Sequence, residues 1–144
     1  MSTRRIVGLT MAGYSGTPLA SKLGLKEGFA VALLGAPPGF RRSLVPLPPR
    51  ISWHGELRPR LDCVVLFAPD LATLEARFAP AAASLAAAGM LWVAWPKKAS
   101  KVPTDLTEDR VRAHGLAGGL VDVKVCAVDE VWSGLKFVRR LGDR

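Results

Sequence analysis

Cysteine is scarce in this chain of 144 residues, which contains only Cys63 and Cys126. Neither belongs to a Cys-x-x-Cys pair, so a zinc site or a thioredoxin-type motif of that kind is excluded. Both residues lie in strongly apolar stretches, which is typical of buried thiols in proteins from a reducing compartment. We therefore expect two reduced cysteines in a cytoplasmic protein.

Long hydrophobic runs are also lacking, since no apolar segment reaches the roughly 18–20 residues that a membrane-spanning helix needs. Within residues 1–16, Arg4 and Arg5 precede a mildly apolar run. This arrangement is faintly similar to a twin-arginine export signal. Gly8 and Thr10 interrupt that run, and no small-residue cleavage site follows it. We expect a loose basic N-terminal segment and no membrane partner.

Acidic residues are few, with 12 Asp and Glu against 20 Lys and Arg, giving a formal net charge of +8. A basic surface attracts polyanions, so an anionic small molecule and nucleic acid are both possible partners. Hydrophobic residues make up 49% of the chain and charged residues 22%. This balance and the length indicate one globular domain, which we place at 17–144.

Apolar runs of strand length alternate with helical patterns along this domain. The expected strands are 29–36, 51–54, 61–69 and 90–95, the expected helices 17–24, 70–89 and 107–115, and the expected hairpin 120–128 with 131–140. This order predicts a single three-layer, Rossmann-like α/β domain with a mostly parallel sheet and a C-terminal antiparallel hairpin. The link 55–61 is too short for a crossover helix, so the second and third strands should flank the first.

Capping residues define the ends of the expected helices. Thr17 is expected to cap the first helix, with Pro18 at its first position and Gly24 after its end. Asp70 and Thr107 are expected to cap the other two. Within the second helix Pro80 should cause a kink, and Gly89 should end it. In the third, Arg112 and His114 lie near the end, where cations complement the helix dipole.

Two resemblances to known families extend this reading. The stretch "LDCVVLFAPDLATLEARFAPAAASLAAAGMLWVAWPK" resembles the later half of the class I S-adenosylmethionine-dependent methyltransferase scaffold. A closer resemblance covers almost the whole chain, through "GYSGTPLASKLGLKEG", "LLGAPPGF", "LWVAWPKKASKV", "TDLTED" and "GLVDVKVCAVDEVWSGLKFVRR". These motifs are similar to the small bacterial proteins grouped as domain of unknown function 3052. That resemblance implies a Rossmann-like domain with no established activity.

A candidate site follows from the expected sheet, because ligands of open parallel sheets bind outside the carboxyl ends of the strands. Three loops should meet there: "GAPPGFRR", the Pro69–Asp70 pair and "PKKASK". If they do, their cations should form an anion-binding edge. The candidate ligand-binding residues are Gly35, Gly39, Arg41, Arg42, Asp70, Trp95, Lys97, Lys98 and Lys101.

The loop "GAPPGF" occupies the position of a nucleotide-binding glycine-rich loop, but its two prolines lack N–H donors and the GxGxxG spacing is missing. A plain tight turn is the alternative. Methyltransferases usually carry acidic residues before this loop and at the end of the second strand. The matching stretches here read "VALLG" and "ISWHGE", with Glu56 alone nearby, so no cofactor is expected. For Lys97, Lys98 and Lys101, the alternative to a ligand role is that their charge keeps the protein soluble.

No catalytic or metal-binding group stands out. Strand alternation would place Asp122, Lys124 and Cys126 on one face, with Asp129 nearby, but no histidine base accompanies them. Tyr14 and Ser15 precede a helix N-terminus, where anions can bind or the chain simply turns. Four tryptophans are present, of which Trp92 and Trp132 should fill the core or cover the sheet. Trp95 is the candidate for stacking on a base.

The reading favoured by these residues is a non-enzymatic protein that binds a phosphate-bearing anion at the carboxyl edge of the sheet. The alternatives are a reduced S-adenosylmethionine-dependent methyltransferase and a nucleic-acid-binding protein, and a homodimer through the hairpin edge is possible. The favoured reading predicts that Lys97→Ala with Lys98→Ala abolishes ligand binding without loss of fold. Unchanged affinity in that double variant would contradict it.

Overall fold

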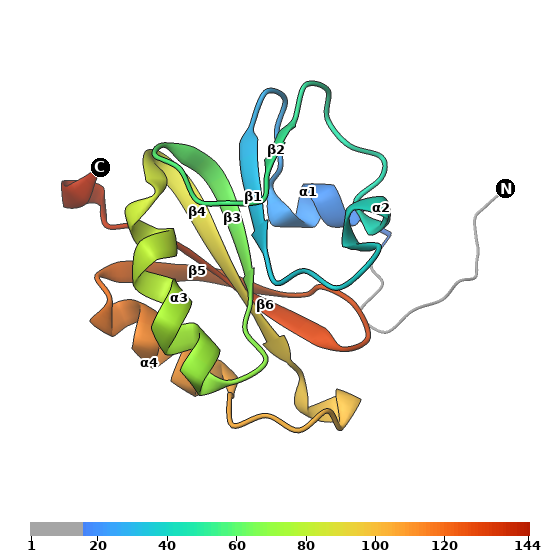
Figure 1. Cartoon of the computed structure of the whole chain (residues 1–144), viewed down its shortest axis with the longest axis vertical. Helices are drawn as coiled ribbons and strands as arrows, with labels where there is room; N and C mark the ends of the chain where they lie inside the picture. Colours follow the sequence, from blue (N-terminus) through green and yellow to red (C-terminus); the bar gives the residue numbers. More distant parts are fainter. Residues whose placement is uncertain (1–15) are drawn as a thin grey trace, which may run out of the picture.

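A six-stranded mixed sheet forms the centre of the molecule, whose residues 16–144 the computed structural model describes (Figure 1). The strand order is β2-β1-β3-β4-β6-β5. The first four strands in this order are parallel, and β6 is antiparallel to both of its neighbours. The expectation that the second and third strands flank the first is confirmed. The strands are β1 (Ala30–Leu34), β2 (Ser52–His54), β3 (Leu61–Phe67), β4 (Leu85–Pro96), β5 (Leu120–Ala127) and β6 (Trp132–Arg139).

Helices cover both faces of this sheet, as Figure 1 shows. On one face lie α3 (Leu71–Ala83) and α4 (Glu108–Ala117), and on the other lie the short helices α1 (Leu19–Leu23) and α2 (Phe40–Ser43). Two single 3-10 turns, η1 (Lys98–Ser100) and η2 (Leu141–Asp143), complete the elements. The predicted three-layer, Rossmann-like class with a C-terminal hairpin is confirmed.

Strand alternation divides the core between the two layers. On β4, Leu91 and Val93 pack under α3 and α4, while Trp92 points the other way toward α1. Trp92 is 1% exposed, and its indole Nε1 donates a hydrogen bond to the carbonyl oxygen of Leu23 at 2.9 Å. This bond satisfies both a buried indole N–H and a carbonyl of the last turn of α1. The expected core role of Trp92 is confirmed.

The capping residues behave as expected at two of the three helices. The Asp70 carboxylate accepts a hydrogen bond from the backbone N–H of Thr73 at 2.8 Å, and the Thr107 hydroxyl accepts one from that of Arg110 at 3.2 Å. The first helix differs, because Pro18 rather than Thr17 occupies its N-cap position. Pro18 has an extended backbone, with ψ at 145°, so the helix begins one residue later than expected.

The predicted end of the second helix at Gly89 is wrong. The helix ends at Ala83, a few residues beyond Pro80, and Leu85 already pairs with Leu61 of β3. Between Leu61 and Cys63 the pairing then jumps from Leu85 to Met90, so the alanine-rich segment between them bulges out of the sheet. A Cβ at Gly89 would lie 2.7 Å from the carbonyl oxygen of Leu61, which explains the glycine at this position.

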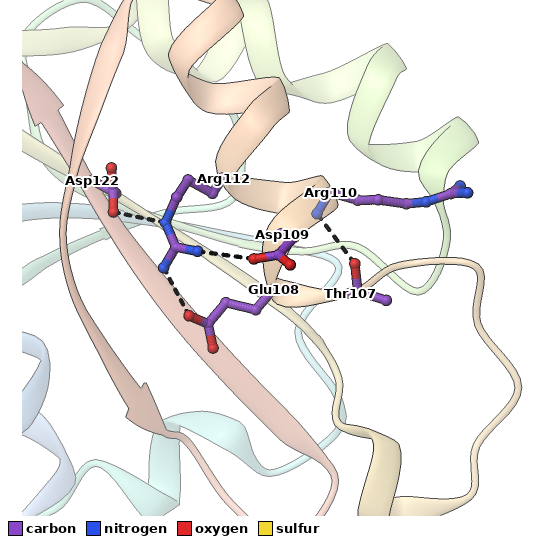
Figure 2. A network of polar contacts seen from close by, with 6 residues as sticks. All are labelled: Thr107, Glu108, Asp109, Arg110, Arg112 and Asp122. Atoms are coloured by element: carbon purple, nitrogen blue, oxygen red, sulfur yellow. Dashed lines mark hydrogen bonds and ion pairs between the residues drawn. The ribbon is translucent and has the colours of Figure 1, made fainter.

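Arg112 contacts three carboxylates, two on its own helix α4 and one on β5, as Figure 2 shows. Its Nη2 lies 2.7 Å from Glu108 Oε2, its Nη1 3.3 Å from Asp109 Oδ1, and its Nε 2.9 Å from Asp122 Oδ2. The hydrogen bond from Arg112 is the main cause that lowers the pKa of Asp122 below its ordinary value of 3.8. Arg112 therefore holds a helix against an edge strand, a role beyond the predicted interaction with the helix dipole.

Among residues 16–144, no helix is both long enough and apolar enough to cross a membrane.

Gly115 lies on the buried face of α4, where a Cβ would overlap the ring of Phe137. We expect Gly115→Ala to lower the free energy of unfolding by about 1–3 kcal/mol, because overpacking outweighs the better helix propensity of alanine. Urea unfolding measures this change. Gly55→Ala is the control, since a Cβ there meets nothing within 4 Å. Equal midpoints for the two variants would show that α4 shifts freely over β6.

Asp122→Asn tests the contribution of the Arg112 contact through its pH dependence. The pKa of Asp122 is lowered in the folded state from its ordinary value of 3.8. The ionised carboxylate therefore stabilises the fold fully at pH values above 3.8. That contribution is lost as the pH falls through the lowered value. Wild type should therefore be more stable than the variant at neutral pH, with urea midpoints that converge below pH 3.8. Asp109→Asn, at a side chain 96% exposed, should change little. A gap that persists in acid would contradict this account.

Candidate anion-binding site

The strand order places a topological switch point between β1 and β3. From β1 the chain moves outward to β2 and then returns to β3 on the opposite side of β1. In open α/β sheets the carboxyl ends of strands flanking such a point border a crevice where ligands bind. The loop 35–39, which reads "GAPPG", leaves β1 at this point.

Both glycines of this loop adopt a left-handed backbone, with φ at 70° for Gly35 and 80° for Gly39. A Cβ at Gly35 would lie 3.1 Å from the carbonyl oxygen of Phe67, so β1 and β3 approach closely here. Gly39 occupies the N-cap of α2, and the N–H of Phe40 donates to the carbonyl oxygen of Pro37 at 3.1 Å. The glycines thus form a tight turn, and a ligand role for them stays a prediction.

Three aromatic rings fix the elements around the end of β3. The ring centroids of Phe40 and Phe67 are 4.9 Å apart, and those of Phe67 and Trp132 are 5.1 Å apart. Both pairs meet edge to face, the arrangement that aromatic quadrupoles favour. This row attaches α2 and the start of β6 to the same strand end. Trp132 covers the sheet as expected.

The first groove at this edge, here called the α2 groove, has a volume of about 580 Å³. Arg41 and Arg42 line it together with Gly39, as three of the candidate residues. The Arg41 guanidinium lies 4.4 Å from the ring centroid of Trp53, a cation–π contact that orients it. The other residues that line the α2 groove are all apolar: Leu33, Ala36, Pro37, Phe40, Val45 and Leu47.

A second groove, here called the switch-point groove, has a volume of about 460 Å³ on the α3 side of the same loop. Its lining residues are Gly35, Phe67, Pro69, Ala72, Thr73, Ala76 and Arg77. The Arg77 Nη1 lies 4.0 Å from the position of a Cβ on Gly35, so this guanidinium extends over the end of β1. Arg77 is not among the residues predicted from the sequence. Its spacing of four residues from Thr73 places it on one helix face, but only the strand order shows that this face meets β1.

Within residues 16–144, none of these three arginines, Arg41, Arg42 and Arg77, has a carboxylate oxygen within 4.0 Å of its guanidinium nitrogens. The remaining residues, 1–15, contain no Asp or Glu. Most of the net positive charge of a protein is solvated, but three arginines without ion pairs around one loop focus a positive potential there.

The lysines do not join this group. Lys97 donates its backbone N–H to the carbonyl oxygen of Val131 at 2.7 Å, and Lys98 begins η1. Figure 1 shows η1 beyond the end of β4, well apart from α2. Neither groove is lined by Lys97, Lys98 or Lys101. Lys97, Lys98 and Lys101 thus share neither groove with the arginines, and the anion-binding edge formed by both sets of cations stays a prediction.

The segment after the lysines closes the N-terminus of α3. The Thr104 hydroxyl donates to the carbonyl oxygen of Pro69 at 2.8 Å, and the Asp105 carboxylate accepts from the N–H of Leu71 at 2.8 Å. Asp70 accepts from the backbone N–H of Thr73, and hydrogen bonds from the side chain and then the backbone of Thr73 lower the pKa of Asp70. Two carboxylates of the chain itself thus occupy this helix end. Asp70 caps the helix and lines neither groove, and its ligand role stays a prediction.

Trp95 is a correction, because it is only 5% exposed. Alternation along β4 turns its side chain into the core with Leu91 and Val93. The predicted stacking of its ring on a base is therefore wrong, because the ring is buried.

The expectation that Asp122, Lys124 and Cys126 share one face of the sheet is also wrong. The register pairs Asp122 with Phe137 and Lys124 with Lys136, so Val123 is an extra residue. This bulge turns Asp122 to the α4 face, away from Lys124 and Cys126. Burial raises the pKa of the Cys126 thiol, which disfavours the reactive thiolate.

The remaining expectations concern turns and metals. Asp129 accepts hydrogen bonds from the N–H groups of Val131 and Trp132, both at 2.8 Å, and so stabilises the hairpin turn. Tyr14 and Ser15 lie outside the described residues. No group of three or more His, Cys, Asp or Glu that could hold a metal occurs within residues 16–144.

No family model matches the chain, and no curated protein matches it by sequence. Solved structures do match it in fold. A possible exported protein from Bordetella parapertussis has a TM-score of 0.60 at 13% identity and covers 84% of this chain, which spans 65% of that protein. A TehB-like SAM-dependent methyltransferase from Corynebacterium glutamicum has a TM-score of 0.53 at 9% identity, covering 85% of both chains.

Magnesium protoporphyrin IX methyltransferase from Synechocystis, with bound S-adenosylmethionine, is another neighbour, with a TM-score of 0.54 at 12% identity and coverage of 85% and 74% of the two chains. At these identities the likeness shows the fold alone. The resemblance to the class I methyltransferase scaffold is thus confirmed as a fold, while membership of the uncharacterised bacterial family stays a prediction.

Proposed function

We propose that this protein binds a small phosphate-bearing molecule in the α2 groove. The observation that carries the proposal is that Arg41 and Arg42, which have no carboxylate partner among the described residues, line one groove beside Gly39. Guanidinium groups recognise phosphate through paired N–H donors. The stacking of Arg41 on Trp53 reduces the entropy lost when such a pair forms.

The apolar walls of this groove indicate that the ligand is more than a free anion. Val45 is 66% exposed at the groove, and Leu33, Phe40 and Leu47 form further apolar surface. Small-molecule sites commonly combine apolar walls with a few polar groups that fix orientation. A phosphate ester with an apolar or aromatic portion fits both features.

Binding rather than catalysis is the role we favour at this edge. Neither groove is lined by a histidine, a cysteine or a carboxylate. These are the groups that most often serve as general acids, general bases or activating partners of a nucleophile. We therefore keep the non-enzymatic reading. Membership of the family grouped as domain of unknown function 3052 is part of the same proposal.

A reduced methyltransferase is the second candidate, favoured by the fold of the structural neighbours. The groups that would hold S-adenosylmethionine in such a site do not match the expectation for that family. No carboxylate lines either groove, β1 reads "AVALL", and β2 ends at His54 with Glu56 two residues beyond it. The residues present do not fit the cofactor.

Arg41→Ala with Arg42→Ala tests the proposal. We expect the double variant to bind AMP at least about tenfold more weakly than wild type, because hydrogen bonds to charged groups contribute about 1.5–3 kcal/mol each. Titration calorimetry with AMP, inorganic phosphate and NAD measures this loss. Thermal unfolding with the same ligands supports it, since a ligand at a hundred times its Kd should stabilise the fold by about 2.7 kcal/mol.

Lys97→Ala with Lys98→Ala is the matched control, since it removes the same charge outside the two grooves. Because these lysines line neither groove, we expect the variant to leave AMP affinity unchanged, in place of the loss that the sequence alone predicts. A loss in this variant, with none in the arginine variant, would favour the lysine edge that the sequence suggests. Stabilisation by S-adenosylhomocysteine alone would favour the methyltransferase reading. Binding to a short RNA that weakens steeply with salt would favour nucleic acid.

A further inference from the structure

We infer that Arg42 and Arg77 form the two ends of a clamp for a ligand with two linked anionic groups, of the oligophosphate class, held across loop 35–39. This inference rests on the proposed function and narrows its ligand class. It adds Arg77 and the switch-point groove to the α2 groove, on the opposite side of the same loop.

One guanidinium lies over each end of the loop. A Cβ at Gly35 would be 4.0 Å from Arg77 Nη1, and a Cβ at Gly39 would be 3.7 Å from Arg42 Nη2. Both positions are glycines with a left-handed backbone, so neither position has a side chain of its own beneath the guanidinium. The two arginines come from different elements, α2 and α3, and meet at this loop from opposite layers.

The distance to be bridged suits a short phosphate chain. Four residue steps separate Gly35 from Gly39, so their Cα atoms lie at most about 14 Å apart even in a fully extended backbone. The hydrogen bond from Phe40 N–H to the carbonyl oxygen of Pro37 turns the loop and shortens that span. Two long, unpaired arginine side chains can close the remaining gap onto one oligophosphate.

The prolines of the loop explain why side chains must supply the charge. Glycine-rich phosphate loops bind anions with successive backbone N–H groups. Pro37 and Pro38 have no N–H, so this loop cannot form such a series of donors. An anion at this edge is therefore neutralised by guanidinium groups, and one is available on each side.

The switch-point groove has room for the second anionic group. Ala72 and Ala76 present small side chains to it, and Arg77 is the one charged residue among those that line it. The neighbouring carboxylates of Asp70 and Asp105 are both held by backbone N–H groups of α3. They leave Arg77 without an ion pair.

Titration calorimetry with inorganic phosphate and tripolyphosphate tests the clamp. Wild type should bind tripolyphosphate at least about tenfold more tightly than phosphate, because two charge-assisted contacts replace one. Arg77→Ala should remove this advantage and leave phosphate affinity unchanged. Arg42→Ala should weaken both ligands, and Arg77→Lys should retain part of the advantage.

Arg110→Ala is the control for the loss of one positive charge, since Arg110 lines neither groove. Its side chain also points away from the carboxylate cluster of α4 (Figure 2). Equal losses in Arg110→Ala and Arg77→Ala would show nonspecific attraction and overturn the clamp. Unchanged tripolyphosphate affinity in Arg77→Ala would overturn it as well, while phosphate binding that depends on Arg42 would leave the proposed function intact. If neither phosphate nor AMP binds wild type, the proposed function fails too. Circular dichroism confirms that each variant is folded.

Discussion

The carboxyl ends of β1 and β3 meet at a contact that has room for hydrogen but little for a side chain. The carbonyl oxygen of Phe67 lies 3.1 Å from where a Cβ of Gly35 would be. The chain must therefore leave β1 in a left-handed turn, which directs the next residues away from β3 and into α2. The position of Arg42, and hence the α2 groove, follows from this one close approach.

The aromatic row of Phe40, Phe67 and Trp132 stabilises the same edge from one side. It connects three segments that are far apart in the sequence, so their relative positions depend on packing rather than on chain connectivity. On the other side, Asp105 and Thr104 bind the loop between β3 and α3. The grooves are thus formed by a rigid edge, which suits a site that orients a ligand by a few polar groups.

Much of the fold could be predicted from the sequence, because apolar runs of strand length and short links restrict the topology strongly. The alanine-rich segment 84–89 could not, since alanine suits both a helix and the irregular start of β4, and only the pairing of Leu85 with Leu61 decides between them. The bulge at Val123 also left no sequence signal, and it moved Asp122 to the opposite face.

The candidate site was predictable in part. The expected strand order pointed to the loop after β1, and Arg41 and Arg42 line a groove beside that loop. The expected order did not reveal that β4 continues past the edge and carries its lysines away from the arginines, nor that Trp95 faces the core. Arg77 was missed because the helix face that meets a strand end depends on how α3 packs.

The bulge at Val123 has a consequence for how this sheet ends. It lies on β5, the outermost strand, and interrupts the regular spacing of backbone donors and acceptors along an edge of eight residues. Next to it Lys124 faces Lys136 directly across the pair, so like charges border the same strand. A strand from a neighbouring molecule would meet mismatched hydrogen-bonding groups and positive charge, which are common protections against aggregation through an open edge.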